Sequence, residues 1–547
     1  MTKPFSRRCR PGLTCAALLL AANLASPTAV LVQAPRLVVV LVIDQFRADY
    51  IETYGSHWTG GLRRLLDEGA WFTEAAYPYY NTVTCAGHST ISTGSFPATH
   101  GMIANSWWDR EAARRVRCTF DPETPAVSYG ATEVEREGES AHRFLVPTLP
   151  DEMRTQLDGV RIATFSLKER SAIGLAGQRA DALLWLGGDG SWLTSRAFSP
   201  APVPFLAEWL RADPLTDAVG QAWERVGDLE SYLHVDDAEG ERPPAEWARA
   251  FPHPLIGAAG ADPQFLERWK TSPWSDAYLG KLGRAALDSL ALGQRDSVDY
   301  LGIAFSALDL VGHRFGPRSH EVQDLLRQLD RTIGELLDAL DREVGAGRYV
   351  VALSADHGVS PIPEQMQAEG FDAGRVLMRP IGERLEAVLV PRFGPGPHVA
   401  AVTAGGVYFA PGVYDRLTAD PPALDEAIAA LAGSPGVAKV FRREALMNGA
   451  PADPDARAVA LSFHPDRSGD LLFTQKPYWM SGVAASHGTS NLYDQEVPVV
   501  LYGAGIQPGR YRGPVTPADI APTLGRMIGV TLPRPDGRVL TEALAPR

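Results

Sequence analysis

Four long, largely apolar runs dominate the hydrophobic pattern of the chain and predict buried strands. They cover residues 37–43, 297–305, 349–353 and 497–502. Runs of this length without strict alternation are typical of strands in a parallel sheet that is covered on both faces. Apolar residues at helical spacing over 320–344 predict a long amphipathic helix. Strands that alternate with helices predict an α/β fold with a doubly wound, mostly parallel sheet.

Two long regions interrupt this alternation. Residues 188–290 are rich in Trp, Pro and polar helical pattern, and residues 362–478 mix strand and helix patterns. The chain has 547 residues, but no repeat, charge block or Ser/Gly tract divides it into modules. We therefore expect one catalytic domain over residues 36–535, in which these two regions are insertions that could cover the site.

The N-terminus has the layout of an export signal. Basic residues, among them Arg7 and Arg8, precede an apolar stretch from Leu13 to about Ala25, and small residues follow. This pattern predicts a signal peptide over residues 1–30 and a periplasmic or secreted protein. No later segment offers 18 apolar residues without charge, so we expect no stable membrane span. The cleavage site and the export route stay open.

Composition narrows the classes of partner. Hydrophobic residues make up 45% of the chain and charged residues 21%, an ordinary globular balance. The formal net charge of −13 lacks the basic footprint of a nucleic-acid-binding protein. No coiled coil or flat apolar edge is evident, so we expect a monomer.

Two cysteines remain beyond the predicted signal, Cys85 and Cys118. In an oxidising compartment such a pair can form a disulfide. The alternative is two buried thiols.

Carboxylates and imidazoles gather behind the predicted strands. Ligands of doubly wound sheets lie beyond the carboxyl ends of the strands. Asp309 and His313 have a spacing that places both on one side of a helical turn. A mixed nitrogen and oxygen set suits Zn²⁺, and six ligands are enough for two ions in one cleft. The six candidate ligands are Asp44, Asp309, His313, Asp356, His357 and His487.

Thr84 is the candidate nucleophile. Small residues from Ala86 to Gly94 predict a helix that starts near Thr84, so its hydroxyl would meet the positive end of the helix dipole. A nearby zinc ion would lower the pKa of that hydroxyl further. The alternative is that Thr84 only caps the helix.

Three polar side chains are candidates for holding a phosphate group. The strand pattern over 162–167 would deliver Lys168 and Arg170 onto one side, because side chains two apart in a strand share a face. An ammonium and a guanidinium on one face can bind the oxygens of a phosphate monoester. Asn105 is the third candidate. The alternative for the two basic residues is a solvated edge beside Glu169.

The order of these motifs resembles that of the alkaline phosphatase superfamily, and more narrowly the exported, phosphate-irrepressible bacterial alkaline phosphatases that use Thr as the nucleophile. The resemblance runs from Val38 to about Leu524. It implies an alkaline phosphatase-like fold and a hydrolase that releases inorganic phosphate from varied small-molecule phosphate monoesters through a phospho-threonine intermediate on Thr84.

The same resemblance implies two zinc sites. Asp309, His313 and His487 would bind one ion. Asp44, Asp356 and His357 would bind the other, with the Thr84 oxygen facing it. Asn105, Lys168 and Arg170 would hold the phosphoryl oxygens.

Two other functions stay open. A phosphodiesterase or nucleotide pyrophosphatase of the same superfamily would share the metal ligands, the Thr and the Asn. It would not need the two cations Lys168 and Arg170, because a diester carries only one negative charge. A zinc-binding exported module without catalytic activity is the second alternative.

Overall fold

A computed structural model describes residues 1, 2, 4, 34–130, 138–257, 262–447 and 451–546. The predicted export signal, residues 1–30, therefore lies almost wholly outside the described residues. The main sheet of the described chain has ten strands. Their order is β22 (Gly509–Tyr511), β2 (Ala70–Phe72), β21 (Val499–Gly503), β14 (Tyr349–Ser354), β1 (Leu37–Ile43), β13 (Asp299–Phe305), β8 (Ile162–Ser166), β9 (Ala182–Leu186), β10 (Trp192–Ser195) and β6 (Ala126–Ser128).

The centre of this sheet is parallel, as the apolar runs predict. β1 pairs in parallel with both β13 and β14, and β8 and β9 continue the parallel series beyond β13. One of the four predicted strands differs from its neighbours, because β21 runs antiparallel to β14. An apolar run reports burial on both faces, and β21 meets that condition because Val500 and Tyr502 pack into one core and Val499 and Leu501 into the other, whichever way the strand runs.

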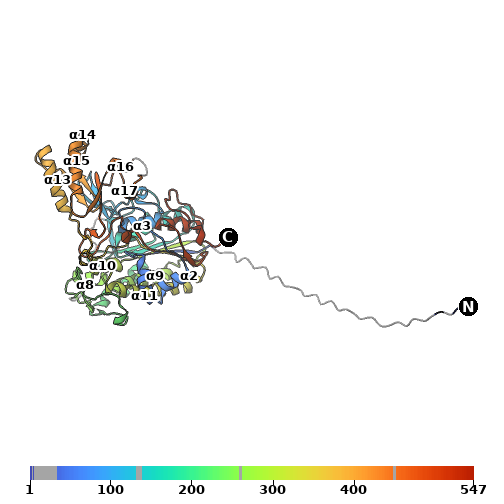
Figure 1. Ribbon diagram of the computed structural model, residues 1–547. Helices are drawn as coiled ribbons and strands as arrows, with labels where there is room; N and C mark the ends of the chain where they lie inside the picture. The colour runs from blue at the N-terminus through green and yellow to red at the C-terminus, as the bar shows by residue number, and fades with distance from the viewer. Residues whose placement is uncertain (3, 5–33, 131–137, 258–261, 448–450, 547) are drawn as a thin grey trace.

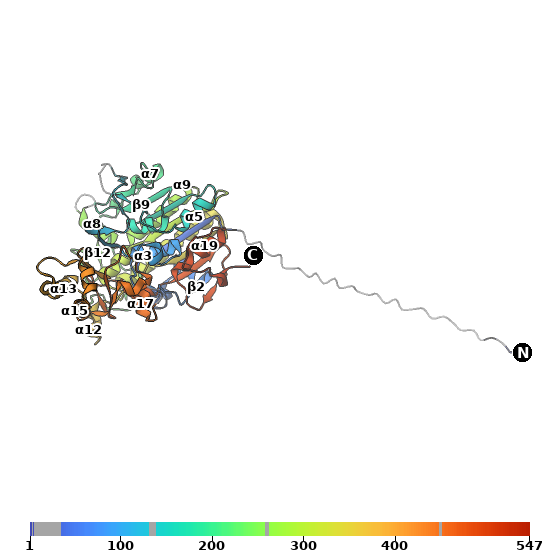
Figure 2. The ribbon, with the colours of Figure 1, turned by 90° about the horizontal axis from the view of Figure 1, so that it is seen from above.

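Helices cover both faces of the sheet. Leu37, Val39 and Leu41 of β1 pack into one core, and Val38 and Val40 pack into another. The first core includes residues of α2 (Gly61–Glu68), α9 (Pro273–Ser289) and α11 (His320–Leu340), and the second includes residues of α3 (Thr84–Thr93), α5 (Leu149–Gln156) and α19 (Ile520–Ile528). Figure 1 shows α3 on one side of the sheet and α2, α9 and α11 on the other. In Figure 2 the face with α3, α5 and α19 is seen from above. These layers confirm the predicted α/β fold.

The long predicted helix is present as α11, and its last predicted residues form a π-helical turn over Asp341–Gly345. Ser319 begins α11, because its side-chain oxygen accepts a hydrogen bond from the Val322 amide. In the described chain, no helix is both long and apolar enough to cross a membrane.

The region 362–478 contains a second sheet with its own core. Its strands are β16 (Val399–Thr403), β17 (Gly406–Phe409), β19 (Leu471–Gln475) and β18 (Val437–Arg442), and the helices α13 (Met378–Phe393), α14 (Val413–Ala419) and α15 (Pro421–Ala432) pack against them. These helices stand to one side of the main sheet (Figure 1). The region 188–290 is different, because its helices α7 (Pro204–Ala212), α8 (Pro263–Lys270) and α9 all contribute residues to the main core.

Candidate active site

The carboxyl ends of the three central strands bring the candidate aspartates together. β1 lies between β13 and β14 in register, with Ile43 opposite Phe305 and Val42 opposite Ser354. Asp44 follows β1 directly and Asp356 follows β14 by two residues. Strands that are parallel and in register end at one edge of the sheet, so these two side chains meet there. Both are completely buried.

Asp309 and His313 lie on α10 (Ala307–Phe315), the helix that follows β13. His313 Nε2 is 3.2 Å from Asp309 Oδ1, as expected for residues one helical turn apart. The start of α10 is held by Asp276, whose Oδ1 accepts hydrogen bonds from the Ser306 and Ala307 amides. Burial raises the pKa of Asp276 to about 7, although these amide bonds favour its charged form. The sequence offered no signal for this positioning role.

The three histidines present the same ring atom to the centre of the cluster. In each ring Nδ1 faces a backbone carbonyl, and such a contact requires the hydrogen to be on Nδ1. Nε2 then carries the free lone pair, which is the form in which histidine binds a metal. The pairs are His313 with Ala485 O at 2.8 Å, His357 with Gly358 O at 2.9 Å and His487 with Thr82 O at 2.9 Å.

The ligand atoms form one continuous cluster with two overlapping groups. Asp44, Asp356 and His357 make one group, and Asp309, His357 and His487 make the other, with the ligand atoms of each group within 4.8 Å of one another. The resemblance placed His313, not His357, with Asp309 and His487. His313 contacts Asp309, while the rings of His357 and His487 stack with centroids 3.5 Å apart.

The cluster carries buried negative charge that cations would neutralise. Asp44 Oδ1 is buried and has no hydrogen-bond partner among the described residues. Burial raises the pKa of Asp44 well above its ordinary value, and the neighbouring carboxylates of Asp309 and Asp356 add to this effect. Three buried carboxylates face one lysine in this space. A donor set of carboxylate oxygens and imidazole nitrogens around an unsatisfied negative charge fits divalent metal ions.

Lys168 lies between two of these carboxylates. Its Nζ donates hydrogen bonds of 2.6 Å to Asp44 Oδ2 and to Asp309 Oδ2. Burial opposes the charge of Lys168, but the two carboxylates outweigh burial and raise its pKa. Burial likewise opposes the charge of Asp309, but His313 and Lys168 hold its pKa well below the ordinary range.

The strand argument for Lys168 and Arg170 is wrong, although both residues are close to the site. β8 ends at Ser166, Lys168 is the residue that precedes α6 (Glu169–Ala176), and Arg170 lies inside α6. Their relative direction is therefore set by a strand-to-helix turn and not by strand alternation. Arg170 Nη1 is 3.4 Å from Glu169 Oε1.

Thr84 is the first residue of α3, as the pattern of small residues predicts. Its side chain is buried, and Oγ1 lies 3.5 Å from His357 Nε2. Gly87 permits this placement, because a Cβ at position 87 would lie 2.1 Å from the Asp356 carbonyl oxygen. Only a glycine lets α3 approach the end of β14 so closely.

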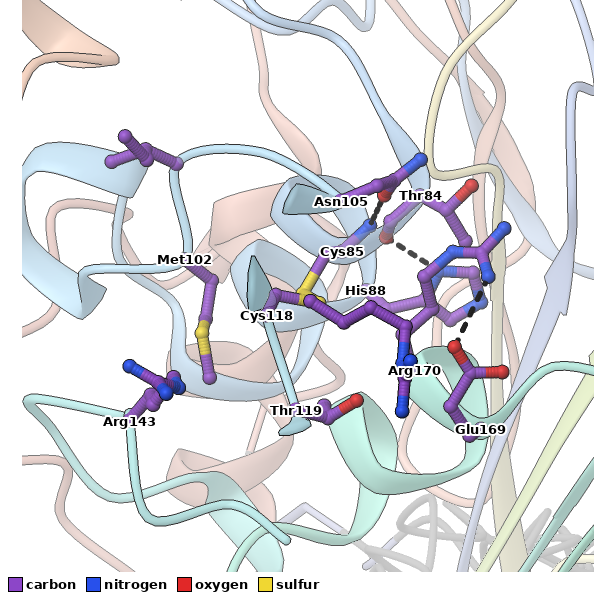
Figure 3. Close-up of a disulfide and its surroundings, with 12 residues drawn as sticks. Thr84, Cys85, His88, Met102, Asn105, Cys118, Thr119, Arg143, Glu169 and Arg170 are labelled. Carbon is purple, nitrogen blue, oxygen red and sulfur yellow. Dashed lines mark hydrogen bonds and ion pairs between the residues drawn. A yellow bond between two sulfur atoms is a disulfide. The ribbon is translucent and has the colours of Figure 1, made fainter. Parts of the chain in front are cut away.

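Asn105 and a disulfide fix the start of α3 (Figure 3). Cys85 and Cys118 form a disulfide. The Cys85 amide donates to Asn105 Oδ1 at 2.8 Å, and the Cys118 amide donates to the Asn105 carbonyl oxygen at 3.0 Å. Asn105 is therefore held between the two bridged cysteines, and its side-chain NH₂ group is directed by the bond to Cys85.

Two residues that sequence reasoning missed support the cluster. Gln45 donates from its backbone to Asp356 Oδ1 at 3.1 Å and from Nε2 to Asp309 Oδ1 at 2.7 Å. His88 Nδ1 lies 3.2 Å from Asp356 Oδ2 and 2.9 Å from the Thr84 carbonyl oxygen. Their positions next to Asp44 and one helical turn after Thr84 are the signals that could have found them.

Known proteins resemble the chain over most of its length. It is 32% identical to the alkaline phosphatase PhoK of Sphingomonas sp over 92% of this chain and 91% of that protein. It is 28% identical to the alkaline phosphatase PafA of Elizabethkingia meningoseptica over 93% of this chain and 94% of that protein. The crystal structure of PafA superposes with a TM-score of 0.86 over 94% of this chain and 100% of that chain.

More distant structures share the fold alone. Murine ectonucleotide pyrophosphatase / phosphodiesterase 5 is 13% identical with a TM-score of 0.54, over 94% of this chain and all of that chain. The family of type I phosphodiesterases / nucleotide pyrophosphatases matches residues 38–496. The chain belongs to this family, within the alkaline phosphatase superfamily.

Proposed function

We propose that the protein is an exported, metal-dependent alkaline phosphatase that hydrolyses small-molecule phosphate monoesters. The observation that carries this proposal is the position of Thr84 at the start of α3, with Oγ1 3.5 Å from His357 Nε2 in the six-residue cluster. The similarity to PhoK and PafA, both named alkaline phosphatases, supports the monoester reaction over the diester reaction.

Thr84 is the proposed nucleophile. Its oxygen forms a bond to phosphorus while the bond from phosphorus to the ester oxygen breaks, and the proton that the Thr84 hydroxyl loses ends on the departing alcohol. Water then attacks the phospho-threonine, which releases inorganic phosphate and restores the hydroxyl. The position of Thr84 at a helix N-terminus favours the negative charge that develops there.

The six-residue cluster is the proposed metal centre. Asp44, Asp309, His313, Asp356, His357 and His487 would hold two Zn²⁺ ions. Bound zinc supplies Lewis-acid stabilisation of the attacking and leaving oxygens. The three Nδ1 contacts to backbone carbonyls keep the imidazoles in the form that binds metal.

Asn105, Lys168 and Arg170 are the proposed phosphoryl-binding residues. Lys168 is paired with Asp44 and Asp309 in this structure, and cations bound at those carboxylates would release its ammonium for a phosphoryl oxygen. The disulfide orients Asn105 through the Cys85 amide. A monoester carries nearly two negative charges, so two cationic side chains favour it over a diester with one charge.

The nucleophile is tested with Thr84→Ala and the matched variant Thr84→Ser in the presence of zinc. We expect Thr84→Ala to lower kcat on p-nitrophenyl phosphate at least about 1,000-fold, whereas Thr84→Ser keeps a hydroxyl and retains turnover. Acid quench with ³²P-labelled substrate should label the wild-type chain and leave Thr84→Ala unlabelled. A zinc-loaded wild-type protein no more active than Thr84→Ala would favour the catalytically silent zinc-binding module.

The choice of ester is tested with the double variant Lys168→Ala, Arg170→Ala. We expect its kcat/KM to fall about 100-fold on p-nitrophenyl phosphate and less than about tenfold on bis-p-nitrophenyl phosphate, because the lost charges serve the extra charge of the monoester. Equal losses on both substrates would favour the phosphodiesterase alternative.

A further inference from the structure

A cavity of about 590 Å³ opens beside His313. The side chain of His313 is 33% exposed, whereas those of Asp356 and His357 at the other end of the cluster are 0% exposed. The cluster is therefore open to solvent on the His313 side. The charged residues that line the cavity are Lys270, Arg314 and Glu267, and Leu310, Val483 and Ser486 also line it.

The direction of the reaction places the alcohol part of the ester in this cavity. In an in-line displacement the leaving oxygen lies opposite the attacking oxygen. Thr84 Oγ1 lies at the buried end of the cluster, 3.5 Å from His357 Nε2. The leaving group then extends past His313, where Leu310 and Val483 offer carbon surface to an organic body.

Lys270 is a cation in this cavity whose ion pairing is incomplete. It is the last residue of α8 and is half-buried. None of the described carboxylates lies within 4.0 Å of its Nζ, and Glu267, one turn earlier, pairs with Arg314 instead. Burial lowers the pKa of Lys270, which means that its charge is held at a cost. A bound anion would reduce that cost.

A favourable interaction with the helix dipole does not by itself explain the position of Lys270. A lysine in the last turn of a helix interacts favourably with the helix dipole wherever that helix lies. Lys270 also lines the same cavity as the candidate metal ligand His313, and the helix dipole does not account for this position.

We infer that this cavity binds the leaving group of substrates that carry a second anionic group, a carboxylate or a further phosphate, and that Lys270 contacts that group. Phosphorylated hydroxy acids and bisphosphorylated sugars have this chemistry. The inference rests on the proposed monoesterase function and names the substrate class for the same site.

The test compares phenyl phosphate with 4-carboxyphenyl phosphate, which differ by one carboxylate on the leaving group. We expect Lys270→Met to lower kcat/KM for 4-carboxyphenyl phosphate about tenfold, mainly through KM, and to change phenyl phosphate less than about twofold. Each substrate is compared between variants, so the intrinsic reactivity of the two esters cancels. Lys270→Arg should restore most of the loss, and added salt should weaken the preference of the wild-type protein.

Lys281→Met is the matched control, because Lys281 on α9 is 51% exposed and pairs with Asp213 away from the cavity. It should leave both substrates unchanged. Equal losses on both substrates in Lys270→Met, or no loss on either, would overturn the inference while the proposed function stands. A wild-type protein that does not turn over phenyl phosphate would overturn both.

Discussion

The two ends of the candidate site are built from different parts of the fold. At the closed end, Asp44 follows β1 directly and Asp356 follows β14 by two residues, and both side chains are 0% exposed. At the open end, His313 is 33% exposed and lines a cavity with Lys270 of α8 and Val483. The closed end is rigidly set by strand register, whereas the open end depends on segments that pack outside the main sheet. Under the proposed function, the closed end carries the chemistry and the open end selects the leaving group.

Among changes that leave Thr84 in place, the largest effect should come from removing a metal ligand at the closed end. His357 belongs to both ligand groups, so we expect His357→Ala to lose more than half of the bound zinc and at least about 100-fold in kcat. His313→Ala should lose zinc from the open end only. Metal content per chain after dialysis, measured together with phenyl phosphate kinetics, checks this. If His313→Ala loses as much zinc as His357→Ala, the two ends do not bind metal separately.

A smaller effect should follow from opening the disulfide, which supports the closed end alone. We expect the Cys85→Ala, Cys118→Ala variant to lose about 2–4 kcal/mol of unfolding free energy. The backbone amides of both cysteines donate hydrogen bonds to Asn105, so loss of the bridge should loosen Asn105. The kcat of the variant should therefore also fall about tenfold.

Denaturant unfolding and kinetics of the reduced wild-type protein provide the control for this variant. Reduction should reproduce both losses in the wild-type protein and add nothing in the double variant. Unchanged kcat in a protein of lowered stability would show that the bridge does not position Asn105.

The smallest effect is on the pH dependence of stability, and it comes from a buried carboxyl group next to the open end. Glu241 is 2% exposed, and the neighbouring Arg242 amide donates to the carbonyl oxygen of Arg314 at 2.7 Å. Burial raises the pKa of Glu241 from its ordinary 4.5 to about 8. The charged groups that act on it are Arg249, Asp236 and Asp237, and Glu241 in turn acts on Glu321.

The sign of the pH effect follows from the bound proton. Between pH 4.5 and 8 the folded chain keeps a proton that the unfolded chain has released, so the stabilisation is full below 4.5 and is lost as the pH rises through 8. We expect Glu241→Gln to gain about 1–2 kcal/mol over the wild-type protein at pH 9 relative to pH 6. Thermal unfolding at the two values measures this, with the exposed Glu230→Gln as the control. Identical pH dependence in Glu241→Gln and the wild-type protein would contradict the assignment.

The strongest sequence predictions concerned local patterns. The apolar run over 37–43 coincides with β1, the spacing of Asp309 and His313 places both on α10, and the small residues after Thr84 form α3. Each of these predictions depends on periodicity or residue size within one segment. Such a pattern is the same whatever the rest of the chain does.

The predictions that failed concerned the direction of a strand and the relative orientation of two side chains. The run over 497–502 did not show that β21 is antiparallel, and strand alternation did not hold for Lys168 and Arg170. The boundaries proposed for the two insertions stay a prediction, and α9 within the first of them is a helix of the main core.

Local residue order was enough to predict which side chains carry the chemistry, because each strand end and helix start is marked within a few positions of Asp44, Thr84 or Asp309. Tertiary structure alone decided that His357 lies in both ligand groups, that Lys168 lies between Asp44 and Asp309, and that Lys270 shares a cavity with His313. The physical reason is that these contacts join segments more than 40 residues apart, so packing sets their distances and no periodicity within one segment encodes them.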